Sequence, residues 1–243
     1  MPDDPRRALL RVCQSAIAAV HGRKRVRDYL QQHQISTPVF LLSIGKAACA
    51  MAQGAHEVLG ANIVDALVVT KQGHGESLPW PVLEAGHPLP DEQSLAAGQR
   101  LLDFAAAIPP DAAVLVLLSG GASALVEALP EGMDLTQLRA LNDWLLASGL
   151  DIVAMNRIRK RLSRIKGGRL ARLLAPRTVL CLAISDVPGD DPRAIGSGPL
   201  VADSSLQTAP DITGLPHVVA EALRHSPPAP AADDACFHNV QFE

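Results

Sequence analysis

The sequence predicts an α/β fold, a mostly parallel open sheet with helices on both faces, from two observations. Several short runs are apolar almost throughout, as strands are when both faces of their sheet are covered. Helical patterns rich in alanine lie between these runs, and this alternation is typical of parallel sheets. The 243 residues are enough to bury the core of such a fold.

The elements follow one another along the chain in a Rossmann-like three-layer pattern. Asp4 and Pro5 are typical of a helix start, and apolar residues at helical spacing from Leu9 to Val20 give that first helix an apolar stripe. Apolar periodicity and the intervening turn residues predict the other elements. The predicted strands are 39–44, 66–70, an extended stretch at 82–88, 113–118 and 178–184. The predicted later helices are 47–59, 94–107, 122–129, 136–146, 152–162, 169–174 and 218–223.

The composition excludes several classes of protein. A net charge of −3 and a pI near 6.2 do not favour nucleic-acid binding. No apolar run reaches the ~18–20 residues of a membrane helix, and the first residues lack the apolar centre of a signal peptide. The four cysteines are widely separated and lack zinc-site spacing, which favours free thiols in a reducing compartment. We therefore expect a cytoplasmic protein without nucleic-acid or membrane partners.

A proline- and alanine-rich segment at 227–232 predicts a boundary near the end of the sequence. We expect residues 1–225 to form one α/β domain and residues 226–243 to be a linker and the start of another domain.

The first candidate site is a small-residue loop that follows the apolar run 113–118. Its backbone N–H groups and hydroxyls can cradle a phosphate where a strand runs into a helix. An ordinary strand-to-helix turn with a serine cap is an equally open interpretation. The candidate phosphate-binding residues of the loop are Ser119, Gly120, Gly121 and Ser123.

Basic residues beside glycines form the second group of candidates. Lys46 follows a predicted strand, where it can reach a phosphate or carboxylate or can be an ordinary surface lysine. The motif at 166–169 predicts an anion clamp, whereas much of the charge at 157–161 is expected to be a solvated helix face. We expect Lys46 and Arg169 to be catalytic and to reach one cleft. The clamp consists of Lys166, Gly167, Gly168 and Arg169.

Acidic residues after the strand 178–184 form a candidate metal site. Asp186 is expected to associate with Mg²⁺, which commonly takes one or two carboxylates together with substrate phosphates. Asp190 or Asp191 would supply a second carboxylate, or would cap a helix that starts at Pro192.

Two further loops add candidates for substrate or phosphate binding. Ser197 lies in a tight Gly-Ser-Gly-Pro turn that is rich in donors. His87 follows an extended stretch, although a loop histidine is more often a structural hydrogen-bonding group than a catalyst.

These loops belong to a longer ordered set of eight motifs. The motifs are Ile44-Gly45-Lys46-Ala47-Ala48, Val69-Thr70-Lys71-Gln72-Gly73-His74, Glu84-Ala85-Gly86-His87-Pro88, Leu118-Ser119-Gly120-Gly121-Ala122-Ser123-Ala124-Leu125, Asn156-Arg157-Ile158-Arg159-Lys160, Ile165-Lys166-Gly167-Gly168-Arg169-Leu170-Ala171, Ser185-Asp186-Val187-Pro188-Gly189-Asp190-Asp191-Pro192 and Gly196-Ser197-Gly198-Pro199. As an ordered set they resemble the N-terminal domain of the MOFRL-type glycerate 2-kinases, some members of which carry the name hydroxypyruvate reductase.

The resemblance implies Mg²⁺- and ATP-dependent phosphorylation of D-glycerate to 2-phosphoglycerate, in a cleft between two α/β domains. The second domain of that family is not represented in this sequence, so the resemblance implies an N-terminal half with its C-terminal second domain missing. A separate MOFRL-like domain or a homo-oligomer would then be the protein partner.

Two other functions stay open from the sequence. A ligand-binding remnant without catalytic activity would keep only one side of the cleft. An NAD(P)H-dependent hydroxypyruvate reductase is disfavoured, because the sequence has no G-x-G-x-x-G dinucleotide fingerprint.

Overall fold

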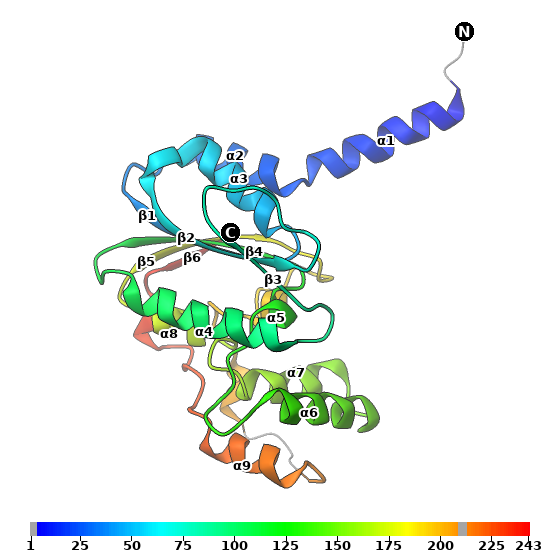
Figure 1. The fold of residues 1–243 in the computed structure, drawn as a ribbon, viewed down its shortest axis with the longest axis vertical. Helices are drawn as coiled ribbons and strands as arrows, with labels where there is room; N and C mark the ends of the chain where they lie inside the picture. Colours follow the sequence, from blue (N-terminus) through cyan, green and yellow to red (C-terminus); the bar gives the residue numbers. More distant parts are fainter. Residues whose placement is uncertain (1–3, 209–212) are drawn as a thin grey trace.

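A six-stranded sheet forms the centre of the protein in the computed structural model, which describes residues 4–208 and 213–243 (Figure 1). The strand order is β3-β2-β1-β4-β5-β6, and every neighbouring pair is parallel. The predicted α/β class is therefore confirmed. The strands are β1 (Val39–Ile44), β2 (Ile63–Lys71), β3 (Val82–Ala85), β4 (Ala113–Ser119), β5 (Thr178–Ile184) and β6 (Val240–Phe242).

The strand order places a switch in direction at the middle of the sheet. The chain builds β1, β2 and β3 toward one edge and then returns to place β4 on the other side of β1. Loops that leave the carboxyl ends of β1 and β4 run to opposite sides, and such a switch point opens a crevice where ligands bind in open α/β sheets.

Helices cover both faces of the sheet, and alternate strand residues point into two separate cores. Leu41 and Val68 pack with α2 (Gly22–Gln32) and α3 (Ala48–Leu59) on one face. Their neighbours Leu42 and Val69 point to the other face, whose core includes three helices (Figure 1). These helices are α4 (Glu92–Ala107), α5 (Ala122–Leu125) and α8 (Arg169–Leu174).

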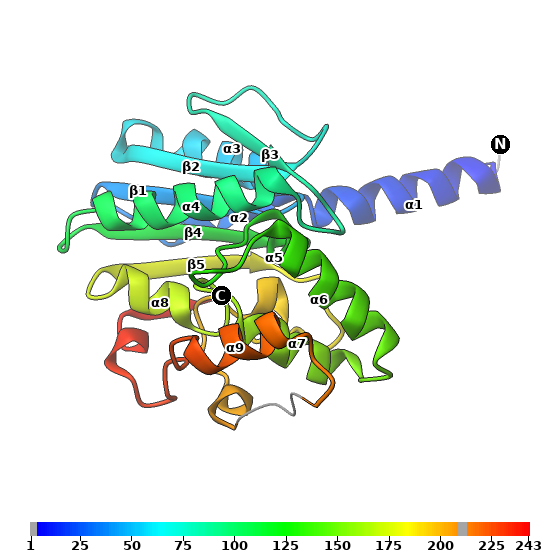
Figure 2. The same ribbon diagram turned by 60° about the horizontal axis from the view of Figure 1, so that its bottom comes forward.

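Three helices form a smaller layer beyond the second face of the sheet (Figure 2). They are α6 (Leu135–Ala147), α7 (Ile152–Arg161) and α9 (His217–His225), and they share their own apolar core. Asp134 caps α6 and Asp151 caps α7 by accepting backbone N–H groups of the first helical turn. This layer holds α6 and α7 beside the carboxyl ends of the strands.

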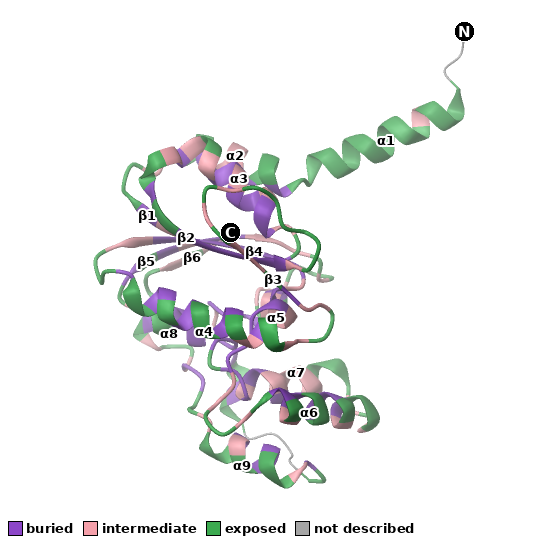
Figure 3. Cartoon of the chain, in the orientation of Figure 1, coloured by how far each residue is buried: buried purple, intermediate pink, exposed green. Residues whose placement is uncertain are grey.

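The first helix, α1 (Pro5–Ala19), projects away from the body of the protein (Figures 1 and 3). Asp4 caps it as predicted, since its carboxylate accepts the N–H of Arg6 at 3.1 Å. The apolar stripe is present, but no residue of α1 is buried and Leu9 is 67% exposed. The apolar spacing thus correctly predicted the helix, but the apolar stripe is not buried against the rest of the domain. Neither α1 nor any other described helix is long and apolar enough to cross a membrane.

The last residues pack against the domain, a feature that the sequence did not predict. Strand β6 pairs with β5, and Arg172 of α8 forms an ion pair with Asp234 at 2.7 Å. The predicted division at residue 225 stays a prediction. The short 3₁₀ helices are η1 (Gly60–Asn62), η2 (Ile195–Ser197), η3 (Ser204–Gln207) and η4 (Ala235–Phe237).

Gly98 lets α4 approach the segment that follows α5, which leads to a first prediction. A Cβ at this position would overlap the backbone carbonyl of Glu127. Alanine stabilises a helix by roughly 1 kcal/mol relative to glycine. The helix propensity of alanine therefore favours the folded state, whereas the steric overlap of its Cβ disfavours it. We expect Gly98→Ala to lower the free energy of unfolding by about 1–3 kcal/mol, because overpacking against backbone cannot relax easily.

Urea denaturation would measure this change, with Arg100→Ala on the exposed side of the same helix as the control. An unfolding free energy of Gly98→Ala that equals or exceeds that of the wild type would contradict the close approach of α4.

Candidate active site

The loops that follow β1 and β4 meet at the switch point, and we refer to the surface above their junction as the crevice. The N–H of Lys46 donates to the carbonyl oxygen of Gly120 at 2.9 Å, and the N–H of Ala47 donates to Oγ of Ser119 at 3.1 Å. Gly45 has a φ of +131°, and a Cβ there would overlap Ser119. Glycine is therefore required where the two predicted loops meet.

Charged and polar side chains gather over the glycine turn of this crevice. Nζ of Lys46 lies 3.4 Å from Oδ2 of Asp186, and about half of each side chain is exposed (42% and 55%). A Cβ on Gly120 would overlap the Asp186 carboxylate, and one on Gly121 would lie 3.0 Å from Cδ2 of His87. The structure thus brings Lys46, Asp186 and His87 together, and their exposure leaves room for a ligand.

The surroundings of His87 favour the neutral form of its imidazole ring. Burial lowers the pKa of the imidazole, and the positive charges of Lys46 and Lys71 lower it further, while Asp186 opposes them. A neutral ring can accept a hydrogen bond or a proton through one nitrogen. Lys71 was not among the predicted site residues, although it ends β2 just before a turn, as Lys46 follows β1.

The turn that contains Ser197 ties two of the predicted loops together. Oγ of Ser197 lies 2.8 Å from Oγ of Ser123. The N–H of Gly167 donates to the carbonyl of Ser197 at 3.0 Å, and the N–H of Gly168 donates to the carbonyl of Gly198 at 2.8 Å. The predicted anion clamp therefore uses its two glycine N–H groups for internal hydrogen bonds.

Lys166 is buried and has a carboxylate partner that the sequence did not reveal. Its ammonium group forms an ion pair with Glu127, and both side chains are about 95% buried. Oγ of Ser163 donates to the other oxygen of the same carboxylate at 2.6 Å. The charge of Lys166 is therefore neutralised within the protein, 39 residues along the chain from its partner.

Arg169 is also buried, and its guanidinium donates to backbone carbonyls. Nη1 donates to the carbonyl oxygens of Lys160 and Lys166 at 3.0 and 3.2 Å, and Nη2 donates to that of Pro227 at 2.8 Å. Burial lowers its pKa to about 10, which leaves it charged at neutral pH. These contacts join the 166–169 loop to the segment after α9. The structure shows no contact between Arg169 and Lys46, and the catalytic role of Arg169 stays a prediction.

Asp191 is engaged with a neighbouring arginine, and the metal role of Asp190 stays a prediction. Oδ1 and Oδ2 of Asp191 accept Nε and Nη2 of Arg193, each at 2.9 Å, and these bonds lower the pKa of Asp191. Asp190 lies in a left-handed turn with φ of +51°, and no α-helix begins at Pro192. Within residues 4–208 and 213–243, no group of three or more His, Cys, Asp or Glu side chains could hold a metal ion.

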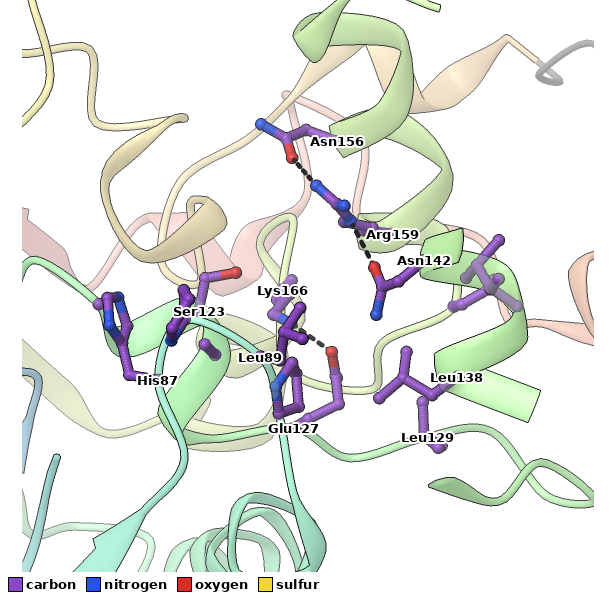
Figure 4. Close-up of a pocket in the computed structure, with 16 residues that line it drawn as sticks. His87, Leu89, Ser123, Glu127, Leu129, Leu138, Asn142, Asn156, Arg159 and Lys166 are labelled. Carbon is purple, nitrogen blue, oxygen red and sulfur yellow. Dashed lines mark hydrogen bonds and ion pairs between the residues drawn. The ribbon is translucent and has the colours of Figure 1, made fainter. Parts of the chain in front are cut away.

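A pocket of about 240 Å³ adjoins the crevice and shares His87 and Gly121 with it (Figure 4). Glu127 and Lys166 line it from below α7, and side chains of α6 and α7 line the opposite wall. Arg159 of α7 lies in this wall.

The expectation that much of the charge at 157–161 is a solvated helix face is wrong for two of its residues. Arg159 lines the pocket, and Lys160 is buried in an ion pair with Asp203 at 2.7 Å. Asn156 and Arg159 lie three residues apart and therefore on one face of the helix. This spacing was the signal in the sequence that could have identified them as part of the pocket wall.

Comparison with known proteins places the chain in a family. Residues 8–220 match the family described as "Domain of unknown function (DUF4147)". The chain belongs to this family. It is 39% identical over 206 residues to a D-glycerate 2-kinase of Thermotoga maritima, a match that covers 84% of this chain and 49% of the relative. It is 41% identical over 174 residues to a glycerate 2-kinase of Pyrococcus horikoshii, covering 71% of this chain and 39% of the relative.

The DUF4147 chain also superposes on a solved structure. The crystal structure of the Thermotoga maritima glycerate kinase matches it with a TM-score of 0.85 and 35% identity, over 97% of this chain and 57% of that one. The predicted relationship to the glycerate 2-kinases is therefore confirmed. The chain spans about half the length of the curated relatives that it matches.

Proposed function

We propose that this DUF4147 chain is the N-terminal domain of a glycerate 2-kinase, which transfers the γ-phosphoryl group of ATP to a hydroxyl of D-glycerate in the cytoplasm. The observation that carries the proposal is the position of Lys46 over the Gly120-Gly121 turn, beside Asp186 and a neutral His87, at the switch point of the sheet. The names of the relatives supply the reaction, and the four free cysteines favour a reducing compartment.

The crevice has the parts that bind a phosphate chain. Phosphoryl transfer depends on positioning and on charges that stabilise the phosphate oxygens. Lys46 supplies a half-exposed positive charge. Lys71 supplies a second positive charge, which is close enough to lower the pKa of His87. The absence of side chains at Gly120 and Gly121 lets the Asp186 carboxylate and the ring of His87 lie directly over the turn.

Asp186 fits the binding of Mg²⁺ together with a phosphate ligand. A hard cation prefers carboxylate and phosphate oxygens, and Mg²⁺ is commonly held by one or two carboxylates plus the phosphates themselves. Asp186 is half-exposed in the crevice, whereas Asp191 is engaged with Arg193. When bound, Mg²⁺ would neutralise phosphate charge. Lys46 and the glycine turn would position the phosphate chain.

The side pocket fits a small acceptor better than a nucleotide. Its 240 Å³ lies below the roughly 300–1,000 Å³ of pockets for drug-sized ligands. His87 lines both the pocket and the crevice, so its neutral ring is placed to accept a hydrogen bond from an acceptor hydroxyl.

A coupled assay with MgATP and D-glycerate tests the function, with calorimetry to measure the binding of each ligand. We expect the 243 residues to bind the ligands weakly and to turn over slowly, because one domain leaves the crevice open to water.

Addition of the C-terminal half of the Thermotoga maritima relative should raise the rate. Binding without turnover in both preparations would favour a ligand-binding module. Consumption of NADH with hydroxypyruvate would contradict the kinase.

The role of Asp186 gives a second prediction. Asp186→Asn keeps the shape of the side chain but removes the charge that a hard cation needs. We expect ATP binding in the presence of Mg²⁺ to weaken by about tenfold or more, while ATP binding in the presence of EDTA changes little. Calorimetric titrations with and without Mg²⁺ would measure both affinities.

Asp191→Asn is the matched control for this experiment, because it makes the same chemical change to a carboxylate that Arg193 already holds. An unaltered Mg²⁺ dependence in Asp186→Asn, or an equal effect of the two variants, would rule out the metal role of Asp186.

A further inference from the structure

Arg159 is the positively charged group of the side pocket that lacks an acidic partner. Nε of Arg159 donates to Oδ1 of Asn142 at 3.0 Å, and Nη1 donates to Oδ1 of Asn156 at 3.3 Å (Figure 4). Both acceptors are neutral amides. No carboxylate in the part of the chain that the structure describes pairs with Arg159.

Two lysines that follow Arg159 in the sequence differ from it, because each forms an ion pair with a carboxylate. Lys160 is paired with the buried carboxylate of Asp203, and Lys166 with that of Glu127. Buried charges in proteins are normally paired, because burial without a partner is costly. Arg159 is partly buried, and this burial lowers the pKa of its guanidinium, which still stays charged at neutral pH. An anion that enters the pocket would supply the missing partner.

The two amides also orient the guanidinium. A guanidinium has five N–H donors, and Asn142 and Asn156 accept two of them. The remaining donors belong to Nη1 and Nη2, which together form the planar fork that matches a carboxylate. Asn142 comes from α6 and Asn156 from α7, so the packing of these two helices fixes the direction of the fork.

We propose that Arg159 binds the carboxylate of a small hydroxy acid in the side pocket, with Asn142 and Asn156 as positioning residues. The inference rests on the proposed function in one respect, which is that the phosphate donor binds at Lys46. The apolar side chains of Leu89, Leu129 and Leu138 complete the pocket around such a ligand.

The placement orients the acid for reaction. Arg159 lies in the wall formed by α6 and α7, whereas His87, Gly121 and Ser123 line the side that adjoins the crevice (Figure 4). A short acid with its carboxylate on Arg159 therefore presents its hydroxyl groups toward His87 and the phosphate site. D-Glycerate has this distribution of groups.

Calorimetric titration of the 243-residue chain with D-glycerate and with its amide, glyceramide, tests the inference. Arg159→Met removes the fork, and we expect it to weaken D-glycerate binding by about 30-fold or more. Glyceramide, which has no negative charge, should bind both proteins with similar affinity. Arg159→Lys should restore part of the preference for the acid. Arg139→Met, on the exposed side of α6, is the matched control and should bind like the wild type.

Three outcomes would overturn the inference. They are undetectable binding of D-glycerate to the wild-type chain, unchanged binding in Arg159→Met, and an equal loss for the acid and the amide, which would indicate a merely structural role. Circular dichroism would verify that each variant is folded.

Phosphoryl transfer, measured separately, distinguishes this inference from the proposed function. D-Glycerate binding that depends on Arg159, without any phosphoryl transfer, would support the inference and contradict the kinase. A KM for D-glycerate that Arg159→Met leaves unchanged in an active preparation would contradict the inference alone.

Discussion

Replacement of Lys46 with methionine is expected to lower the rate of phosphoryl transfer by roughly 10²–10³-fold, the effect typical of removing one preorganised charge-stabilising donor. Lys46 follows β1 at the switch point, and its ammonium group is half-exposed beside Asp186. Methionine has a similar length without the charge, so the fold of the loop should persist. The coupled assay with MgATP and D-glycerate would measure the rate, in the preparation that shows turnover.

Two variants sharpen this experiment. Lys46→Arg keeps the charge and should retain more activity than Lys46→Met. Lys24→Met removes an exposed lysine of α2 that already pairs with Asp28, and it should keep the wild-type rate. A Lys46→Met protein with wild-type turnover would show that the crevice at β1 and β4 is not where the phosphate chain binds.

Replacement of Glu127 with alanine is expected to cause the largest loss of stability. It leaves the ammonium group of Lys166 buried without its partner and also removes the acceptor of the Ser163 hydroxyl. Breaking a buried pair in this way costs about 3–5 kcal/mol. For a protein of this size the loss corresponds to a decrease in Tm of roughly 6–20 °C. Differential scanning calorimetry would measure it.

The double variant Glu127→Met/Lys166→Met tests the cause of this loss. Replacing both charged groups with apolar ones removes the unpaired charge, and the double variant should regain much of the stability that Glu127→Ala loses. Asp28→Asn, which breaks the exposed pair with Lys24, should leave Tm nearly unchanged. A Tm of Glu127→Ala within a degree or two of the wild type would show that this pair does not hold the pocket wall.

The sequence alone predicted most of the elements that carry the crevice. Strands β1, β4 and β5 are continuous apolar runs, and an apolar run between turn residues is a local signal. Since parallel strands end at one edge of the sheet, the loops after them had to lie together. The order of strands and loops along the chain is therefore enough to predict that Lys46, Gly120 and Asp186 lie at the same edge of the sheet.

The tertiary structure decided which basic residues can meet a ligand. Lys46, Lys166, Arg159 and Arg169 all lie near glycines or in a charged helix, so local patterns do not separate them. Lys166 is neutralised by a residue 39 positions away, and Arg159 is oriented by Asn142 from another helix. The first pair depends on how the segment after α5 packs against the loop before α8, and the second contact depends on how α6 packs against α7. Both are long-range properties.

The same reason explains the two ends of the described chain. The apolar spacing of α1 fixed its helical conformation, because periodicity of side chains is a local property. The spacing could not determine that α1 buries none of its residues, or that residues 240–242 would join the sheet beside β5. The sequence by itself determined the conformation of each segment and the edge of the sheet where a site could form. Only the packing of distant segments decided that Lys160 and Lys166 are paired within the protein, and that Arg159 lies in a pocket wall without an acidic partner among the described residues. The physical reason is that the free energy of a charge removed from water depends on neighbours that the chain brings together from far apart.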